Sequence, residues 1–148
     1  MSHSFVANAV HVVFSTKKRL NIIPAHRQKK LWGYMASIAR HRTIDVFTVG
    51  GTENHVHLLL AVPASMALAK AVQSVKAISS KWMRETGQSG FGWQEGYGAF
   101  SVSRSQLGAV VEYINNQQEH HRKHTFEAEF LSLLKKHGIA YDLKYVFG

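Results

Sequence analysis

The sequence contains no cysteine among its 148 residues, which excludes a disulfide framework and a thiolate metal site. Acidic residues are also scarce: 9 Asp and Glu stand against 18 Lys and Arg, giving a formal net charge of +9 and a pI near 10.0. Such an excess of positive charge favours a polyanionic partner, most simply a nucleic acid, because cationic side chains displace the counterions condensed on phosphates. A basic protein with no such partner is the alternative.

Long apolar runs are missing as well. No stretch approaches the length needed to cross a bilayer, and no charged-then-apolar leader opens the sequence. We therefore expect a cytoplasmic protein with no membrane partner. The phosphate loop G-x-x-x-x-G-K is absent, so we expect no nucleotide cofactor. The length suits one domain over 1–148 with a core of its own.

Hydrophobic periodicity and turn residues predict eight elements in the order β-α-β-β-α-β-α-α. Their expected ranges are strands at 5–16, 44–49, 56–62 and 99–103, and helices at 25–42, 66–86, about 106–123 and about 126–136. The first six elements, a core over 5–103, match the split βαβ, ferredoxin-like arrangement βαββαβ. The predicted fold class is therefore α+β, with a four-stranded antiparallel sheet, two helices on one face and two added C-terminal helices.

The third predicted strand carries His55 and His57. Because side chains alternate along a strand, both histidines project to one face, while Val56 and Leu58 project to the other. Two imidazoles so placed can bind one metal ion. An H-x-H pair is common in unrelated proteins, so it needs support from elsewhere in the chain. The neighbouring Asn54 is most simply a turn former.

Tyr113 and Gln117 are four residues apart on the predicted helix over about 106–123, so they share a face. Gln117 can supply an oxygen as a third metal ligand, and Tyr113 a nucleophile for a phosphodiester. Three neutral ligands leave the negative charge to the substrate phosphate, which suits Mg²⁺ or Mn²⁺. A tyrosine that simply packs in the core is the alternative for Tyr113.

Other polar residues receive a weaker interpretation. His120, His121 and His124 are expected to form a polar helix end, without a chemical role. Glu127 and Glu129, in the first turn of the last helix, complement its dipole. The basic candidates for DNA contacts are Lys17, Lys18, Arg19 and Arg104, although charged residues at such positions are often only solvated.

The stretch ENHVHLLL resembles the HUH motif, in which two histidines flank one hydrophobic residue. EYINNQQEHH resembles the tyrosine helix of the single-tyrosine HUH transposases of the insertion-sequence two-hundred-like group, and HVVFSTKKR, GYGAFSVS and YDLKYVFG are similar to further segments of that family. The resemblance spans nearly the whole chain. It implies a ferredoxin-like homodimer that cleaves and rejoins single-stranded DNA through a 5′-phosphotyrosine, leaving a free 3′-OH. It makes His55, His57 and Gln117 metal ligands and Tyr113 the nucleophile.

The resemblance also implies that the substrate is a DNA hairpin near the ends of an insertion sequence. In many members the tyrosine helix docks into the partner subunit, which would make each site composite. Transposases associated with repetitive extragenic palindromes share both motifs and tend to be monomers, but Gln117 favours the insertion-sequence group. A domesticated protein that only binds hairpin or single-stranded DNA, and a small metal-binding structural domain, remain as alternatives.

Overall fold

The structure is a computed structural model that describes residues 4–148. Within that range, four strands form one antiparallel sheet in the order β2-β3-β1-β4. The strands are β1 (Ala9–Ser15), β2 (Asp45–Gly51), β3 (His55–Ala61) and β4 (Gly98–Ser101). This arrangement confirms the predicted fold class, α+β with a four-stranded antiparallel sheet.

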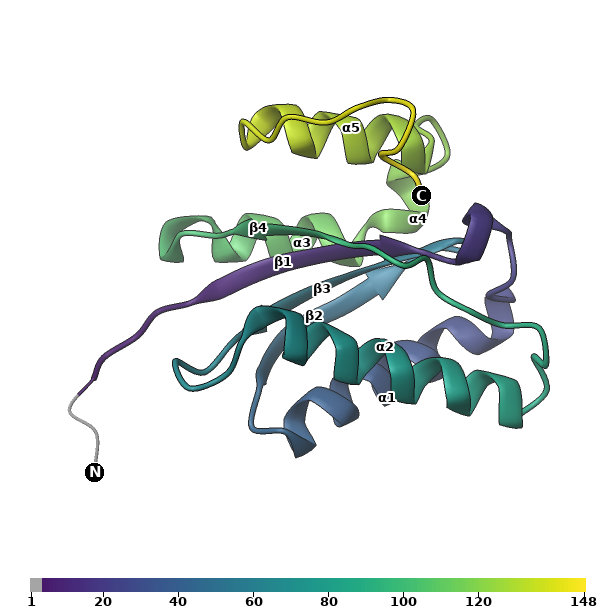
Figure 1. Cartoon of the computed structure of the whole chain (residues 1–148), viewed down its shortest axis with the longest axis horizontal. Coiled ribbons are helices and arrows are strands. Elements are labelled where there is room, and N and C mark those ends of the chain that lie inside the picture. Colours follow the sequence, from purple (N-terminus) through teal and green to yellow (C-terminus); the bar gives the residue numbers. More distant parts are fainter. Residues whose placement is uncertain (1–3) are drawn as a thin grey trace.

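Helices α1 (Ala25–His41) and α2 (Leu68–Glu85) cover one face of the sheet (Figure 1), here called the apolar face. The sheet side chains beneath them include Val12, Phe14 and Leu58, which belong to the larger buried hydrophobic cluster of the molecule. Their alternation along β1 and β3 is the one predicted from the sequence. Burial of this stripe supplies the main driving force for packing the helices onto the strands.

Helices α3 (Leu107–Asn115), α4 (Gln117–His120) and α5 (Phe126–Lys136) lie on the opposite face, here called the site face. The single helix expected over 106–123 is therefore divided, because Asn116 between α3 and α4 leaves the helical conformation (φ −105°, ψ 21°). Asparagine readily makes local hydrogen bonds that compete with helix. The predicted range of α5 agrees with the structure, and Thr125 Oγ1 caps it by accepting from Ala128 N–H at 3.1 Å.

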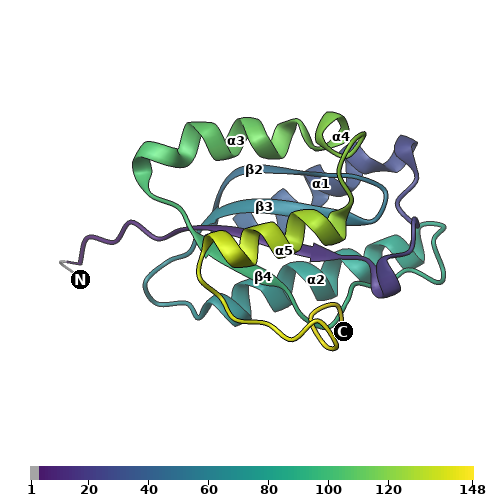
Figure 2. The same ribbon diagram turned by 90° about the horizontal axis from the view of Figure 1, so that it is seen from above.

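Seen from above, α3 lies over β2 and β3, and α5 lies over β1 and β4 (Figure 2). Two glycines allow this close approach. A Cβ built on Gly50 would lie 2.6 Å from the backbone oxygen of Ile114 in α3, and one on Gly98 would lie 2.7 Å from the ring of Phe130 in α5. Both distances are shorter than real contacts, so the two helices rest directly on the sheet backbone.

A second, smaller hydrophobic cluster fastens α5 to the sheet. Phe126, Phe130 and Leu134 pack there against Val13 and Phe100, and the C-terminal segment adds partly buried side chains. The 3-10 turns η1 (Lys17–Arg19) and η2 (Arg104–Gln106) follow β1 and β4. Among the described residues, no helix combines the length and the apolar character that crossing a membrane requires.

Candidate active site

His55 and His57 lie next to each other on β3 and face the three C-terminal helices. Both side chains are completely buried, and their ring centroids are 5.1 Å apart. Strand alternation produces this arrangement, since the intervening Val56 belongs to the cluster on the apolar face. The structure thus places the two rings on one face, as the sequence predicted.

A neighbouring side chain holds each ring by its Nδ1 atom. His55 Nδ1 lies 2.9 Å from both Asn54 Oδ1, which accepts, and the Thr52 hydroxyl, which can accept or donate. His57 Nδ1 lies 2.7 Å from Nε2 of the buried His11. Metal-binding histidines are commonly oriented by such outer partners. Asn54 is therefore more than a turn former, and His11 was not predicted at all.

The carboxylate of Glu129, on α5, lies at the centre of the site. Its Oε1 atom is 3.0 Å from His57 Nε2, 3.1 Å from His121 Nε2 and 3.4 Å from His55 Nε2. Its Oε2 atom accepts hydrogen bonds from the Tyr113 hydroxyl and, at 3.1 Å, from Gln117 Nε2. One buried carboxylate thus joins groups from β3, α3, α4 and the turn after α4.

Tyr113 and Gln117 reach the site from either side of the helix break. Tyr113 is in the last turns of α3, and Gln117 is the first residue of α4. The Gln117 side chain is almost fully buried, with Oε1 2.9 Å from His55 Nε2. The structure therefore brings His55, His57, Tyr113 and Gln117 of one chain together.

Burial and hydrogen bonding control the charges in the site. Burial alone would raise the pKa of Glu129, but hydrogen bonds from the surrounding histidines lower it far below its usual value, so the carboxylate stays ionised. Burial and the charge of Glu129 raise the pKa of Tyr113, which keeps the resting phenol protonated. Burial lowers the pKa of His57 to about 4 and that of His11 to about 3. Neutral imidazoles are the form that binds metals.

These residues fit a divalent cation by their chemistry and spacing. One donor atom from each of His55, His57, His121 and Glu129 lies within 4.8 Å of the others. Imidazole nitrogens together with a carboxylate oxygen are ordinary ligands of divalent transition ions. A cluster able to bind a metal is therefore present on the site face.

A cavity of about 790 Å³ opens next to this cluster. Tyr113, Glu129 and His11 line it, together with Lys136 and His137 at the end of α5. The phenol thus faces a space that an external molecule can enter. Basic side chains in the cavity wall favour an anionic ligand.

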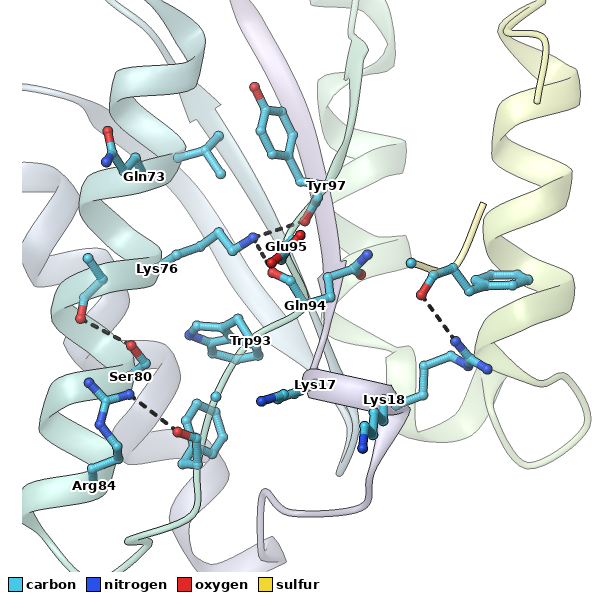
Figure 3. A pocket seen from close by; sticks show the side chains of 18 of the residues that line it. Lys17, Lys18, Gln73, Lys76, Ser80, Arg84, Trp93, Gln94, Glu95 and Tyr97 are labelled. Carbon is cyan, nitrogen blue, oxygen red and sulfur yellow. Dashed lines mark hydrogen bonds between the residues drawn. The ribbon is translucent and has the colours of Figure 1, made fainter. Parts of the chain in front are cut away.

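A second, larger groove of about 1050 Å³ lies between α2, the glycine-rich segment 87–97 and η1 (Figure 3). Lys17 and Lys18 project into it from η1, and Lys76 and Arg84 from α2. Lys76 Nζ anchors the glycine-rich segment by donating to backbone oxygens of Gln94 and Gly96, at 2.6 and 2.9 Å. The groove is therefore basic and has a well-fixed wall.

The four basic residues singled out from the sequence differ in their surroundings. Lys17 and Lys18 line the groove freely, whereas Arg19 forms an ion pair with Glu127 at 3.0 Å and stacks on the Phe147 ring at 4.8 Å. Arg104 is on η2, after β4, and does not line the groove. Lys17, Lys18 and Arg19 thus all line the groove, with Arg19 engaged in contacts of its own, and only Arg104 lies apart.

Sequence reasoning missed three residues of the site: His11, His121 and Glu129. For Glu129 a signal was available, because it lies between Phe126 and Phe130 on the buried stripe of α5. A carboxylate on an apolar stripe needs a compensating partner. His121 gave no such signal, since it belongs to a polar run of histidines.

The fold is an α+β sheet with two buried histidines on one strand and a tyrosine on a following helix. The family model described as "Transposase IS200 like" matches residues 4–117. Because that match covers most of the chain, this protein belongs to the IS200-like transposase family. Membership in the family makes it a transposase, and a DNA-cleaving enzyme by class.

Individual relatives agree with the family assignment. The ISDra2 transposase TnpA of Deinococcus radiodurans is 24% identical over 116 residues, which cover 74% of this chain and 83% of that protein. A crystal structure described as a transposase from D. radiodurans R1 has a TM-score of 0.63 at 21% identity, covering 79% of this chain and 96% of that one. The REP-associated tyrosine transposase bound to a REP hairpin has a TM-score of 0.60 at 12% identity, covering 82% and 73%. The two structures share the fold.

Proposed function

We propose that this transposase cleaves and rejoins single-stranded DNA at the ends of an insertion sequence, with Tyr113 as the nucleophile. His55, His57 and Gln117 bind the divalent ion, Mg²⁺ or Mn²⁺, that assists the reaction. The products of cleavage are a 5′-phosphotyrosine and a free 3′-OH. No nucleotide cofactor is required, because the covalent intermediate conserves the energy of the broken bond for rejoining.

The observation that carries this proposal is the convergence of the Tyr113 hydroxyl, the two β3 imidazoles and the Gln117 amide oxygen on one buried point. The hydroxyl and Gln117 Nε2 both donate to Glu129 Oε2, while Gln117 Oε1 lies 2.9 Å from His55 Nε2. A nucleophile and metal ligands so close together are what phosphodiester attack needs. The cavity next to Tyr113 gives the DNA strand access to it.

Each residue of the site has a separate role in the reaction. Asn54 and His11 orient the two ligand histidines, and Tyr113 Oη attacks the phosphorus atom. As the Oη–P bond forms, the bond to the 3′ oxygen breaks, and the proton lost from the phenol is balanced by the one gained by the 3′-OH. A bound divalent ion neutralises the phosphate and stabilises the charge that develops during in-line displacement.

We assign the basic groove to the DNA flanking the cleaved bond, with Lys17 and Lys18 as phosphate contacts. The REP-associated relative of similar fold is bound to a DNA hairpin, which supports a hairpin as the substrate here. Replacing both lysines with alanine should weaken hairpin binding and reduce its salt dependence, by a slope of about 0.7 to 0.9 per lost phosphate contact. The matched control replaces Lys29 and Lys30 of α1, which are exposed and do not line the groove. An equal effect of that replacement would assign the binding to net charge alone.

We expect a homodimer, as in the family, while each chain contains a complete set of site residues. Mixing a Tyr113→Phe variant with a His57→Ala variant tests whether sites are composite. Restored cleavage in the mixture would show that the tyrosine acts in the partner's site. No restoration is expected if Tyr113 serves its own chain, the arrangement in which it contacts Glu129.

The direct test incubates the protein with single-stranded element ends and Mg²⁺ or Mn²⁺, followed by denaturing electrophoresis. A covalent protein–DNA adduct should form with the wild type and with Tyr145→Phe, a control at an exposed tyrosine. It should be absent with Tyr113→Phe, although hairpin binding persists. An adduct formed by Tyr113→Phe would refute the assignment of the nucleophile.

The same assay separates the alternatives. A domesticated DNA-binding protein would bind hairpins and never form an adduct. A purely structural metal-binding domain would bind no hairpin DNA at all. Preference for extragenic palindrome hairpins over insertion-sequence ends would place the chain with the REP-associated transposases.

A further inference from the structure

Two residues of the site lie beyond Gln117, where the stretch matched by the family ends. They are His121, in the turn after α4, and Glu129, on α5. The Glu129 side chain is only 2% exposed. Burying an ionised carboxylate is costly unless positive charge or several donors compensate it. The part of the chain outside the matched stretch therefore places an anion at the centre of the site.

Two oxygen atoms that only accept hydrogen bonds lie beside Nε2 of His55. Gln117 Oε1 is 2.9 Å and Glu129 Oε1 is 3.4 Å from this nitrogen. On the other side of the ring, Nδ1 lies 2.9 Å from both Asn54 Oδ1 and the Thr52 hydroxyl. When the ring carries its proton on Nδ1, the lone pair of Nε2 and the two oxygens point at one position, which a metal cation can occupy.

The distances from Glu129 to the three imidazoles are close to those between ligands of a small cation. In a tetrahedral site with metal–ligand bonds of about 2.0–2.1 Å, neighbouring donor atoms are separated by roughly 3.4 Å. Glu129 Oε1 lies 3.4, 3.0 and 3.1 Å from the Nε2 atoms of His55, His57 and His121. The donor atoms of the whole set lie within 4.8 Å of one another, so the more widely separated ones must move closer together when the ion binds.

We propose that His121 and Glu129 bind the same divalent ion as His55 and His57, forming a site of three imidazoles and one carboxylate that is loaded before DNA arrives. This inference rests on the proposed function, since it extends the metal site assigned there. Gln117 Oε1 remains adjacent and supplies a further oxygen donor. Glu129 uses Oε1 for the ion and Oε2 for Tyr113 and Gln117, so it links the ion to the nucleophile.

This ligand set has consequences for the choice of ion. Mg²⁺ prefers an octahedral set of oxygens and retains several waters, whereas imidazole-rich sites favour transition ions. DNA-free protein should therefore bind Mn²⁺, and Zn²⁺ more tightly, while binding Mg²⁺ weakly. A site made only of His55, His57 and Gln117 lacks any anionic ligand and should depend more on the DNA phosphate for its affinity.

The test measures Mn²⁺ and Zn²⁺ binding to the DNA-free, full-length chain by calorimetry. Glu129→Gln and His121→Ala should each weaken binding by more than the 10- to 100-fold typical of an outer-shell partner. The matched controls are Glu127→Gln, in the first turn of the same helix, and His124→Ala, in the same histidine run; both should bind as the wild type does. His55→Ala serves as the reference for a lost ligand.

A second measurement covers the case in which a substituted chain does not fold. Anomalous diffraction from wild-type crystals soaked in Mn²⁺ or Zn²⁺ should place the ion about 2.0–2.2 Å from His121 Nε2 and Glu129 Oε1. An ion bound to His55, His57 and Gln117 alone would overturn the inference and leave the proposed function in place. Wild-type protein that binds no ion without DNA would overturn it as well. The proposed function fails separately, if Tyr113→Phe still forms the DNA adduct.

Discussion

The two faces of the sheet use the same strand for opposite purposes. On β3, Val56 and Leu58 enter the hydrophobic cluster under α1 and α2, whereas His55 and His57 enter a polar cluster under α3, α4 and α5. The apolar face needs only shape and volume from its partners, because the hydrophobic effect is not directional. The site face needs particular atoms at particular distances, because each buried polar group must be satisfied.

This difference predicts which property, stability or chemistry, a substitution on each face should reduce. Substitution on the apolar face should cost stability and leave chemistry intact, and isosteric replacements should be tolerated there. Substitution on the site face should cost chemistry first, because removing one partner leaves the others buried and unpaired.

The largest expected effect is that of His57→Ala on the site face. Loss of this ligand should abolish Mn²⁺ binding and lower the rate of adduct formation by at least about 10²–10³-fold. The fold should persist, because the apolar cluster is untouched, as circular dichroism and urea unfolding can establish. A variant that cleaves DNA at the wild-type rate would contradict the role of the ring.

Leu58→Ala, one residue along the same strand, provides the matched change on the apolar face. Leu58 is 1% exposed, so the cavity left behind should lower the free energy of unfolding by about 2–5 kcal/mol. Mn²⁺ affinity, measured at a temperature where the variant is folded, should stay near that of the wild type. Loss of ion binding without loss of stability would break the proposed separation of the two faces.

Acid should destabilise the site face. Burial lowers the pKa of His11 to about 3 and that of His57 to about 4, from an ordinary value of 6.5. Between these values the unfolded chain binds protons that the folded chain excludes. Stability is therefore complete above pH 6.5 and falls as the pH drops towards 4, by up to about 1.4 kcal/mol per pH unit for each histidine.

Urea unfolding of the metal-free chain at about pH 7 and about pH 5 measures this slope. Replacing His11 with glutamine should flatten it, whereas replacing the exposed His26 of α1 should not. Equal stability at both pH values would mean that the buried rings gain protons as readily as those of the unfolded chain.

The smallest effect expected is that of His11→Ala on the affinity for Mn²⁺. His11 holds His57 through Nδ1 at 2.7 Å without facing the ion, and losing such an outer partner costs about 10- to 100-fold in affinity. His11→Gln should recover part of the loss, because an amide can replace the hydrogen bond. If His11 were only structural, His11→Ala and His11→Gln would lose the same stability, and His11→Gln would recover no affinity for Mn²⁺.

The apolar face was predictable because its information is local. Alternation along β1 and β3 and the helical spacing of Leu31, Met35 and Ile38 in α1 specify which side is buried. His55, His57, Tyr113 and Gln117 were proposed as site residues for a similar reason, since each pair has a short spacing that a motif can describe.

The partners of Glu129 and His121 could not be assigned in the same way, because they come together only through tertiary contacts. Glu129 was interpreted as a complement to the dipole of α5, while its true distinction is the set of imidazoles that fold against it from β3 and α4. The break at Asn116 was also missed. The break gives α4 a different direction from that of a continuous helix, and the hydrophobic periodicity of the sequence does not indicate it.

Gly50 gives the absent side chain a mechanical meaning. The β2 backbone at Gly50 lies so close to the carbonyl of Ile114, the residue next to Tyr113, that a Cβ atom would be only 2.6 Å from its oxygen. A single methyl group at Gly50 would displace the end of α3 and move the phenol away from the imidazoles of β3, which would stay in place. The position of the nucleophile thus depends on a residue of β2 that has no side chain.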